Sequence, residues 1–257
     1  MIEFFQRMRN YSLYSLVLAG LVCLVSCGDE KQKLSVDQVI QKTIERHGGE
    51  KYDNMEVEFD FRKRHFRAKI SSGQYVYERT FRGTEGLVTD VWSNDKFKRM
   101  IDQKEIKLDQ QNLRTYRTAT NSVIYFALLP FHLDDPVVNR QLMRSLEIKG
   151  KTYYKVEMTY DENAGGEDFE NVYVYWINKD DFTIDYLAYS FNINGGGVRF
   201  REAYNQRDVN GIRFQDYRNY TIDKDFPAQE LDYAFQTDQL KLLSEIILDN
   251  VKVSLAE

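Results

Sequence analysis

Two long blocks of the chain alternate between apolar and polar residues with a period of two, and this pattern restricts the fold more than any other feature. In the first block, which begins at residue 55, Val57, Phe59 and Phe61 alternate with charged or polar neighbours. The second block runs from residue 146 to about residue 222. Such alternation places apolar side chains on one face of a β-strand. The chain also contains 18 Tyr and 16 Phe, which favour pleated surfaces, so we expect a mainly β (α+β) domain.

Turn signals divide the second block into antiparallel strands. Residues 178–181 form a polar turn between segment 172–177, which is apolar on both faces, and segment 184–191. Asn210-Gly211 between two further apolar runs is a strong signal for a two-residue hairpin. For the last stretch, residues 242–253, we prefer a strand to a helix.

A helix is expected at the start of this domain. Ser35 is suited to the N-cap position, and His47-Gly48-Gly49 ends the segment, with Gly48 suited to the left-handed position after a helix. The residues between them carry an apolar stripe at helical spacing: Val36, Val39, Ile40 and Ile44.

Between the two strand blocks, residues 122–131 are apolar on every side. A short helix without a polar face must be buried all round, and the simplest place is inside a curved sheet. Residues 134–136, Asp-Asp-Pro, then predict the start of a second short helix with Val138 and Leu142 one turn apart. No internal repeat or linker divides the chain, so we expect a single domain over residues 35–257.

The first residues predict a secretory leader. Residues 1–10 carry a net positive charge, and residues 11–26 carry none. This uncharged run of 16 residues is shorter than the roughly 20 that a membrane-spanning helix needs. A small Ser26 directly before Cys27 resembles the lipobox of bacterial lipoproteins, in which the cysteine is acylated after cleavage. An uncleaved anchor helix and an ordinary signal peptide are the alternatives.

Cleavage before Cys27 has consequences for the rest of the chain. It removes a signal peptide of residues 1–26 and leaves the lipidated cysteine and a polar tether over residues 27–34. Because Cys23 and Cys27 are the two cysteines of the sequence, the domain keeps no free thiol, disulfide or cysteine metal ligand. We therefore expect a protein of the cell envelope that is lipid-anchored through Cys27. The outer membrane is the preferred membrane, and the sequence leaves open whether the domain faces the periplasm or the cell surface.

Six segments spread over residues 35–222 together form a recognisable pattern: His47-Gly48-Gly49, Leu128-Leu129-Pro130-Phe131, residues 150–154, residues 174–177, residues 199–202 and residues 210–214. The pattern resembles a family of uncharacterised bacterial lipoproteins that is similar to the LolA/LolB-like lipoprotein carrier fold. The resemblance implies a strongly curved antiparallel half-barrel with an N-terminal helix and central plug helices on its concave side. Members of the wider fold hold acyl chains or other apolar ligands there.

No binding motif of that fold is sharp enough to transfer, so the candidate site follows from position. We expect the central apolar segment and aromatic residues of facing strands to line a ligand cavity: Tyr125, Leu128, Leu129, Phe131, Tyr154 and Trp176. The expected function is that of a membrane-anchored lipoprotein that binds a lipid or acyl chain. The alternative is a structural or interaction lipoprotein whose core is filled by its own side chains, and its protein partners stay open.

Signatures of other functions are missing from the sequence. It contains no metalloprotease, serine hydrolase, phosphate-loop or dinucleotide motif, so we expect no enzyme and no cofactor. His47, His65 and His132 lie far apart, which disfavours a metal site. We expect His47 at a helix end and His65 on a solvated strand face, with contact to anionic lipid headgroups as the alternative for His65. His132 has two aspartates nearby and is only a weak candidate for a metal ligand. The acidic residues of 162–170 fit a solvated loop better than calcium ligands. A net charge of −5 without a basic block disfavours nucleic acid.

Overall fold

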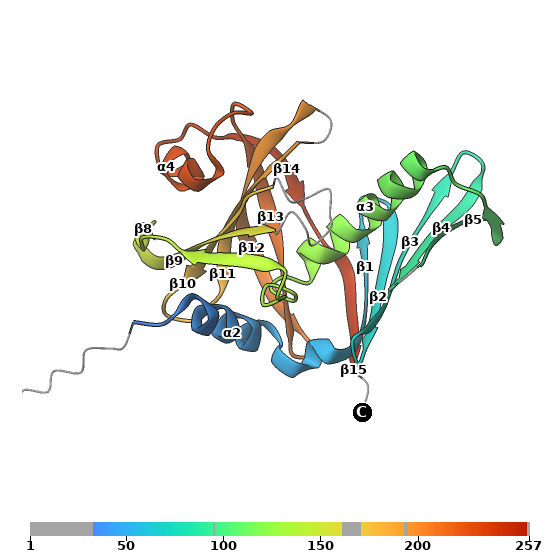
Figure 1. Cartoon of the computed structure of the whole chain (residues 1–257), viewed down its shortest axis with the longest axis horizontal. Coiled ribbons are helices and arrows are strands. Elements are labelled where there is room, and N and C mark those ends of the chain that lie inside the picture. The colour runs from blue at the N-terminus through green and yellow to red at the C-terminus, as the bar shows by residue number, and fades with distance from the viewer. Residues whose placement is uncertain (1–32, 95, 161–170, 193–194, 256–257) are drawn as a thin grey trace, which may run out of the picture. The chain divides into compact units, whose positions relative to one another are not determined.

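Antiparallel strands form two sheets in the computed structural model, which describes residues 33–94, 96–160, 171–192 and 195–255 (Figure 1). Residues Ser35–Glu257 are one compact unit. The N-terminal sheet has the order β15-β1-β2-β3-β4-β5-β6. Its strands are β1 (Asn54–Phe61), β2 (Arg64–Ser71), β3 (Gln74–Gly83), β4 (Gly86–Ser93), β5 (Lys96–Ile101), β6 (Lys104–Ile106) and β15 (Asp249–Leu255).

The C-terminal sheet has the order β14-β13-β12-β11-β10-β9-β7, and β8 also pairs with β9. Its strands are β7 (Val138–Leu142), β8 (Leu146–Ile148), β9 (Lys151–Tyr160), β10 (Tyr173–Asn178), β11 (Ile184–Phe191), β12 (Gly197–Val209), β13 (Ile212–Thr221) and β14 (Lys241–Ile246). Among the described strands, neither sheet closes on itself. The expected mainly β, antiparallel and incomplete architecture is therefore confirmed, with its strands divided between two sheets.

The turn chemistry of the sequence fixes the hairpins. Asn210 and Gly211 have φ angles of 49° and 80°, as a two-residue turn between antiparallel strands requires, and they join β12 to β13. This confirms the predicted hairpin. A side chain at position 211 would also meet Lys51, because a Cβ there would lie 2.7 Å from the Lys51 Cε atom.

The last stretch of the chain links the two sheets. The strand preferred for residues 242–253 is confirmed, but it is two strands, β14 in one sheet and β15 in the other. Leu248 lies between them, and its amide N–H donates to Asp216 Oδ1 at 3.0 Å. Arg207 Nη2 donates to Leu248 O at 2.6 Å and to Asp216 Oδ1 at 3.1 Å. This buried carboxylate thus holds the crossing in place.

Helix α2 (Val36–His47) begins and is stabilised as its sequence predicts. Ser35 Oγ accepts the Gln38 amide N–H at 3.2 Å, and the Ser35 amide N–H donates to Gln38 Oε1 at 2.9 Å, which completes a capping box. The expected left-handed glycine is one residue displaced. Gly48 is extended, with φ of 167°, and Gly49, the first residue of the 3₁₀-helix η2 (Gly49–Asp53), is left-handed, with φ of 57°.

The predicted short apolar helix over residues 122–131 is wrong in its extent. Helix α3 runs over Gln110–Ala127, and its N-cap Asp109 accepts the Asn112 amide N–H at 2.7 Å. Its first three turns are mainly exposed, whereas Ile124 and Ala127 are buried. The apolar segment is therefore the end of a longer amphipathic helix, which lies along β2, β3 and β4 (Figure 1).

The second helix predicted after Pro136 is also wrong, because these residues form β7. Val138 pairs with Tyr160 and Leu142 pairs with Val156 in an antiparallel ladder with β9. Val138 and Leu142 are four residues apart, a spacing that puts side chains on one side of either a helix or a strand. The pairing with β9 decides between the two.

Both faces of the C-terminal sheet are covered. One face packs beneath the 3₁₀-helix η5 (Ala228–Glu230) and helix α4 (Leu231–Gln236), which contribute Ala228 and Leu231 to a buried cluster with Trp176 and Phe200. The other face points toward α3. This explains why segment 172–177 is apolar on both of its faces.

Candidate functional site

A cavity of about 660 Å³ lies where α3 and the turn that follows it meet both sheets. Most of the side chains that line it are aromatic or aliphatic. The period of two selects them, because β10, β11, β12 and β13 each present alternate residues toward α3. The cavity therefore arises from one face of each sheet and the buried end of one helix.

The N-terminal sheet supplies a cluster of three aromatic rings. Tyr75 lies with its ring centroid 4.7 Å from that of Tyr77 and 5.2 Å from that of Trp92. Tyr77 and Trp92 face each other across β3 and β4 with centroids 5.9 Å apart. All three line the cavity. They give it a wall that is apolar and large in area.

The C-terminal sheet contributes a second aromatic wall. Tyr173 stacks on Tyr189 with ring centroids 5.9 Å apart, and Tyr189 lies 6.1 Å from Phe191. Tyr160 lies edge-on to Tyr173 at 5.8 Å. Ring faces with hydroxyl tips are suited to bind apolar ligands while fixing a few polar atoms.

Helix α3 contacts the C-terminal sheet through the hydroxyl of Tyr125. The Tyr125 hydroxyl lies 3.3 Å from the hydroxyl of Tyr160 and 3.3 Å from that of Tyr175. Burial raises the pKa of Tyr125 and Tyr175 well above the ordinary value of a phenol. These groups therefore stay neutral and act as hydrogen-bonding tips.

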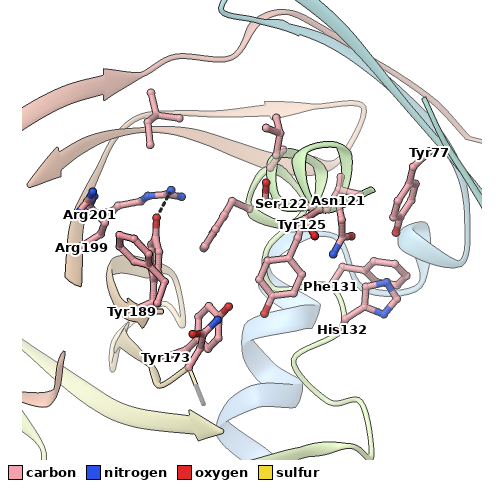
Figure 2. A pocket seen from close by; sticks show the side chains of 18 of the residues that line it. Tyr77, Asn121, Ser122, Tyr125, Phe131, His132, Tyr173, Tyr189, Arg199 and Arg201 are labelled. Carbon is pink, nitrogen blue, oxygen red and sulfur yellow. Dashed lines mark hydrogen bonds between the residues drawn. The ribbon is translucent and has the colours of Figure 1, made fainter. Parts of the chain in front are cut away.

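Two arginines from β12 add positive charge to the cavity. Arg201 is only 8% exposed, its Nη2 donates to the Tyr189 hydroxyl at 3.0 Å, and its guanidinium carbon lies 4.0 Å from the Phe126 ring centroid. Arg199 Nη1 donates to Val198 O at 2.8 Å and to Thr221 Oγ1 at 3.2 Å. Figure 2 shows both arginines on one side of the cavity, near Tyr189.

Phe131 and His132, in the turn after α3, lie on the opposite side from the arginines (Figure 2). The Phe131 ring stacks on Tyr52 with centroids 5.2 Å apart, which fixes the turn to the core. His132 has a left-handed backbone, with φ of 73°, and its ring centroid lies 3.8 Å from that of Phe131. Asp135 also lines this end. Within the described part of the chain, no group of three or more His, Cys, Asp or Glu side chains is placed to hold a metal ion.

The six residues expected to bind ligand divide into two groups. Tyr125, Leu128 and Phe131 line the cavity. Leu129 is buried, but it does not line the cavity. Tyr154 lies away from it, stacked on Phe182 at 6.1 Å.

Trp176 lies on the wrong face of the C-terminal sheet for the expected role. It packs edge-on to Phe200 at 5.5 Å in the cluster beneath α4. Its neighbour Tyr175 points toward α3 instead, because consecutive residues of a strand face opposite sides. Since both faces of β10 are apolar, the sequence pattern did not distinguish the two.

Of the other residues singled out in the sequence, His47 and His65 lie where they are expected. His47 Nδ1 hydrogen-bonds to Thr43 O at 2.8 Å, which confirms its helix-end role, and burial lowers its pKa to about 4. His65 is exposed on β2 and lies 2.9 Å from Asp60 Oδ1, so its solvated position is confirmed. Cys27 and the acidic residues Glu162, Glu167, Asp168 and Glu170 lie outside the described residues.

Sequence reasoning missed the residues that give the cavity its charge and much of its wall. The signal for the arginines was present: in Arg199-Phe200-Arg201 a strand period puts both cations on one face and the ring on the other. Trp92, Tyr173 and Tyr189 follow from the same alternation once the sheet order is known.

No helix in the described part of the chain is long and apolar enough to cross a membrane.

Comparisons with known proteins give distant structural matches. A LolA superfamily protein from Nitrosomonas europaea is 11% identical, with 88% of this chain and 95% of that chain covered and a TM-score of 0.45. A DUF1329 family protein from Desulfovibrio piger is 13% identical, with 86% and 94% covered and a TM-score of 0.46. The lipoprotein LppX from Mycobacterium tuberculosis is 11% identical, with 62% and 87% covered and a TM-score of 0.27.

A comparison with curated protein sequences finds no match. The model of a protein family of unknown function, DUF6503, matches residues 14–249, which is most of the chain. The chain belongs to the DUF6503 family.

Proposed function

We propose that this protein is a lipoprotein of the cell envelope, anchored through an acylated Cys27, that binds a lipid or another hydrophobic ligand between its two sheets. The observation that carries the proposal is the cavity of about 660 Å³ with its aromatic lining. Ligand sites in proteins commonly have volumes of about 300–1,000 Å³, apolar walls and a few placed polar groups. The cavity meets each of these criteria.

The size of the cavity favours a ligand over a self-filled core. Protein interiors pack closely, and their voids are rarely much larger than a water molecule. Core filling is the role of the cluster beneath α4, where Trp176, Phe200 and Leu231 are fully buried. The rings around the cavity behave differently, because Tyr75, Tyr173 and Trp92 remain partly exposed along its surface.

The anchor restricts how such a protein would use its ligand. One acyl chain gives marginal membrane binding, with an association constant of about 10⁴ M⁻¹, whereas two or more give stable attachment. A cysteine with two or three chains stays in its membrane. The ligand would then be received from or passed to a partner, and the protein itself would act as a resident binder.

The binding proposal is tested on residues 28–257, which contain the whole compact unit with its own core. Native mass spectrometry and organic extraction of the purified domain should reveal a co-purified apolar molecule, or affinity for a fluorescent fatty acid. Ser122→Trp, which would fill the cavity from α3, should abolish binding. Thr115→Trp on the exposed part of the same helix should leave binding unchanged. A well-folded domain that neither carries nor binds an apolar molecule would contradict the proposal.

The anchor is tested separately in cells. Full-length protein should incorporate a labelled fatty acid and sediment with membranes, and Cys27→Ala should lose both properties. An unlabelled wild-type protein in the soluble fraction would contradict acylation at Cys27 without bearing on the cavity.

A further inference from the structure

Arg201 differs from the other buried arginines in the described part of the chain. Arg79 and Arg99 share the carboxylate of Asp90, at 2.5 and 2.6 Å. Arg201 is as deeply buried as they are, yet no described carboxylate lies within ion-pair distance of it. Its polar partner is the Tyr189 hydroxyl, and its Nε atom has no hydrogen-bond partner among the described residues. The described residues therefore supply no counter-charge to Arg201.

This arrangement is costly for the protein alone. A guanidinium keeps its charge at any ordinary pH, and burial of an unpaired charge is strongly unfavourable. The ring faces of Phe126 and Tyr189, at 4.0 and 5.2 Å, offset part of that cost through cation–π attraction. The rest remains, and a bound anion would remove it.

Arg199 extends the positive site. It lies two residues from Arg201 on the same face of β12, about 7 Å along the strand, and also lines the cavity. None of its hydrogen bonds to described residues is to a carboxylate: it donates to Val198 O and Thr221 Oγ1. The carboxylate in the lining, that of Asp135, pairs with neither arginine. The charged pair thus occupies one side of an otherwise mainly apolar cavity (Figure 2).

Resting on the ligand-binding function proposed above, we propose that the ligand is an amphiphile with an anionic headgroup, a carboxylate or a phosphate, held by Arg199 and Arg201. The guanidinium fork matches the oxygens of either anion and binds them through two parallel hydrogen bonds. The Tyr189 hydroxyl accepts from Arg201, so its own proton stays available for the same anion. The apolar tail lies against the rings on the opposite side, among them Tyr77 and Phe131.

The test compares ligands that share a tail and differ in the headgroup. Residues 28–257 are titrated with dodecanoate, dodecyl phosphate, dodecanol and inorganic phosphate by calorimetry. Both anionic amphiphiles should bind at least about 10-fold more tightly than dodecanol, since a charge-assisted hydrogen bond contributes that much or more. The ratio of the two anionic affinities then identifies carboxylate or phosphate as the preferred headgroup.

Matched arginine variants locate the headgroup. Arg201→Gln and Arg199→Gln should each weaken binding of the anionic amphiphiles by about 10- to 100-fold and leave dodecanol binding unchanged. Arg218→Gln is the control, because Arg218 lies on the opposite face of the same sheet, paired with Glu202. Arg201→Gln should not lower the free energy of unfolding of the ligand-free domain, whereas replacement of a purely structural arginine would lower it. Should it fail to fold, the less buried Arg199→Gln carries the test.

Three outcomes would overturn the inference. Equal affinities for dodecanol and the anionic amphiphiles would remove the headgroup site and leave the proposed apolar binding intact. Inorganic phosphate that binds as tightly as dodecyl phosphate would remove the amphiphile. Failure of all amphiphiles to bind would contradict the proposed function together with this inference.

Discussion

At the scale of single residues, the buried carboxylate of Asp90 organises the contact between the N-terminal sheet and α3. It accepts hydrogen bonds from Arg79 Nε at 3.0 Å and from Arg99 Nε at 2.6 Å. The Arg99 guanidinium carbon in turn lies 3.2 Å from the ring centroid of Tyr116 on α3. One carboxylate thus pairs with two buried guanidiniums and positions that of Arg99 against the helix.

We predict that Asp90→Asn destabilises the domain by about 3–5 kcal/mol, because it leaves two buried guanidiniums without a counter-charge. Urea denaturation measures this loss. Glu105→Gln in the same sheet is the control, since the Lys98–Glu105 pair is exposed and should contribute less than about 1 kcal/mol. Equal effects of the two substitutions would contradict the structural role of Asp90.

His47 makes the stability of the domain depend on pH. Burial lowers its pKa to about 4, opposed by the hydrogen bond to Thr43 O, whereas the unfolded value is 6.5. Between these values the unfolded chain binds the proton and the folded chain does not. The stabilisation is therefore complete above about pH 6.5, falls as the pH is lowered, and is lost below about pH 4.

We predict that this pH-dependent change in the free energy of unfolding amounts to about 3 kcal/mol and that His47→Gln removes it. The free energy of unfolding of the wild type should fall more steeply from pH 6.5 to pH 4 than that of the variant. Parallel curves for the two proteins would show that His47 is not buried in its neutral form.

At the scale of elements, α3 is buried most deeply toward its C-terminal end. Ile124 and Ala127 are buried, and Leu128 packs in the same core cluster, whereas the first turns carry mainly exposed residues. The part of α3 that borders the cavity is therefore also its most deeply buried part.

We predict that Ile124→Ala lowers the free energy of unfolding by about 2–5 kcal/mol, because Ile124 is fully buried. Leu113→Ala in the first turns removes a half-buried side chain and should cost less than half as much. Urea denaturation of the two variants gives the comparison, and similar losses would contradict the uneven burial of α3.

The elements differ in how well the sequence predicts them, for physical reasons. Strong local signals, the capping box at Ser35 and the Asn210-Gly211 turn, determine their elements almost alone. Strand β7 carries no such signal, because the spacing between Val138 and Leu142 fits a helix and a strand equally. Its pairing with β9 decides that this segment is a strand. Trp176 was misplaced for a related reason: β10 is apolar on both faces, and only the sheet order reveals which face meets α3.

At the scale of the whole domain, the two faces of the C-terminal sheet pack differently. The far face of the C-terminal sheet is closed by α4 and filled by its own side chains. The near face, with α3 and the N-terminal sheet, leaves a cavity lined by aromatic rings and two arginines. The proposed ligand binding rests on this contrast between a filled core and an aromatic cavity.

The two tryptophans of the chain allow the most direct test of ligand binding in that cavity. Trp92 lines it, whereas Trp176 is fully buried on the other side of the C-terminal sheet. A fatty acid brominated along its tail quenches the fluorescence of a tryptophan that it contacts. The measurement is a titration of residues 28–257 with such a fatty acid, in Trp176→Phe and Trp92→Phe variants. We predict strong, saturable quenching of Trp92 in the first variant and little quenching of Trp176 in the second; equal quenching of both, or of neither, would contradict binding in the cavity.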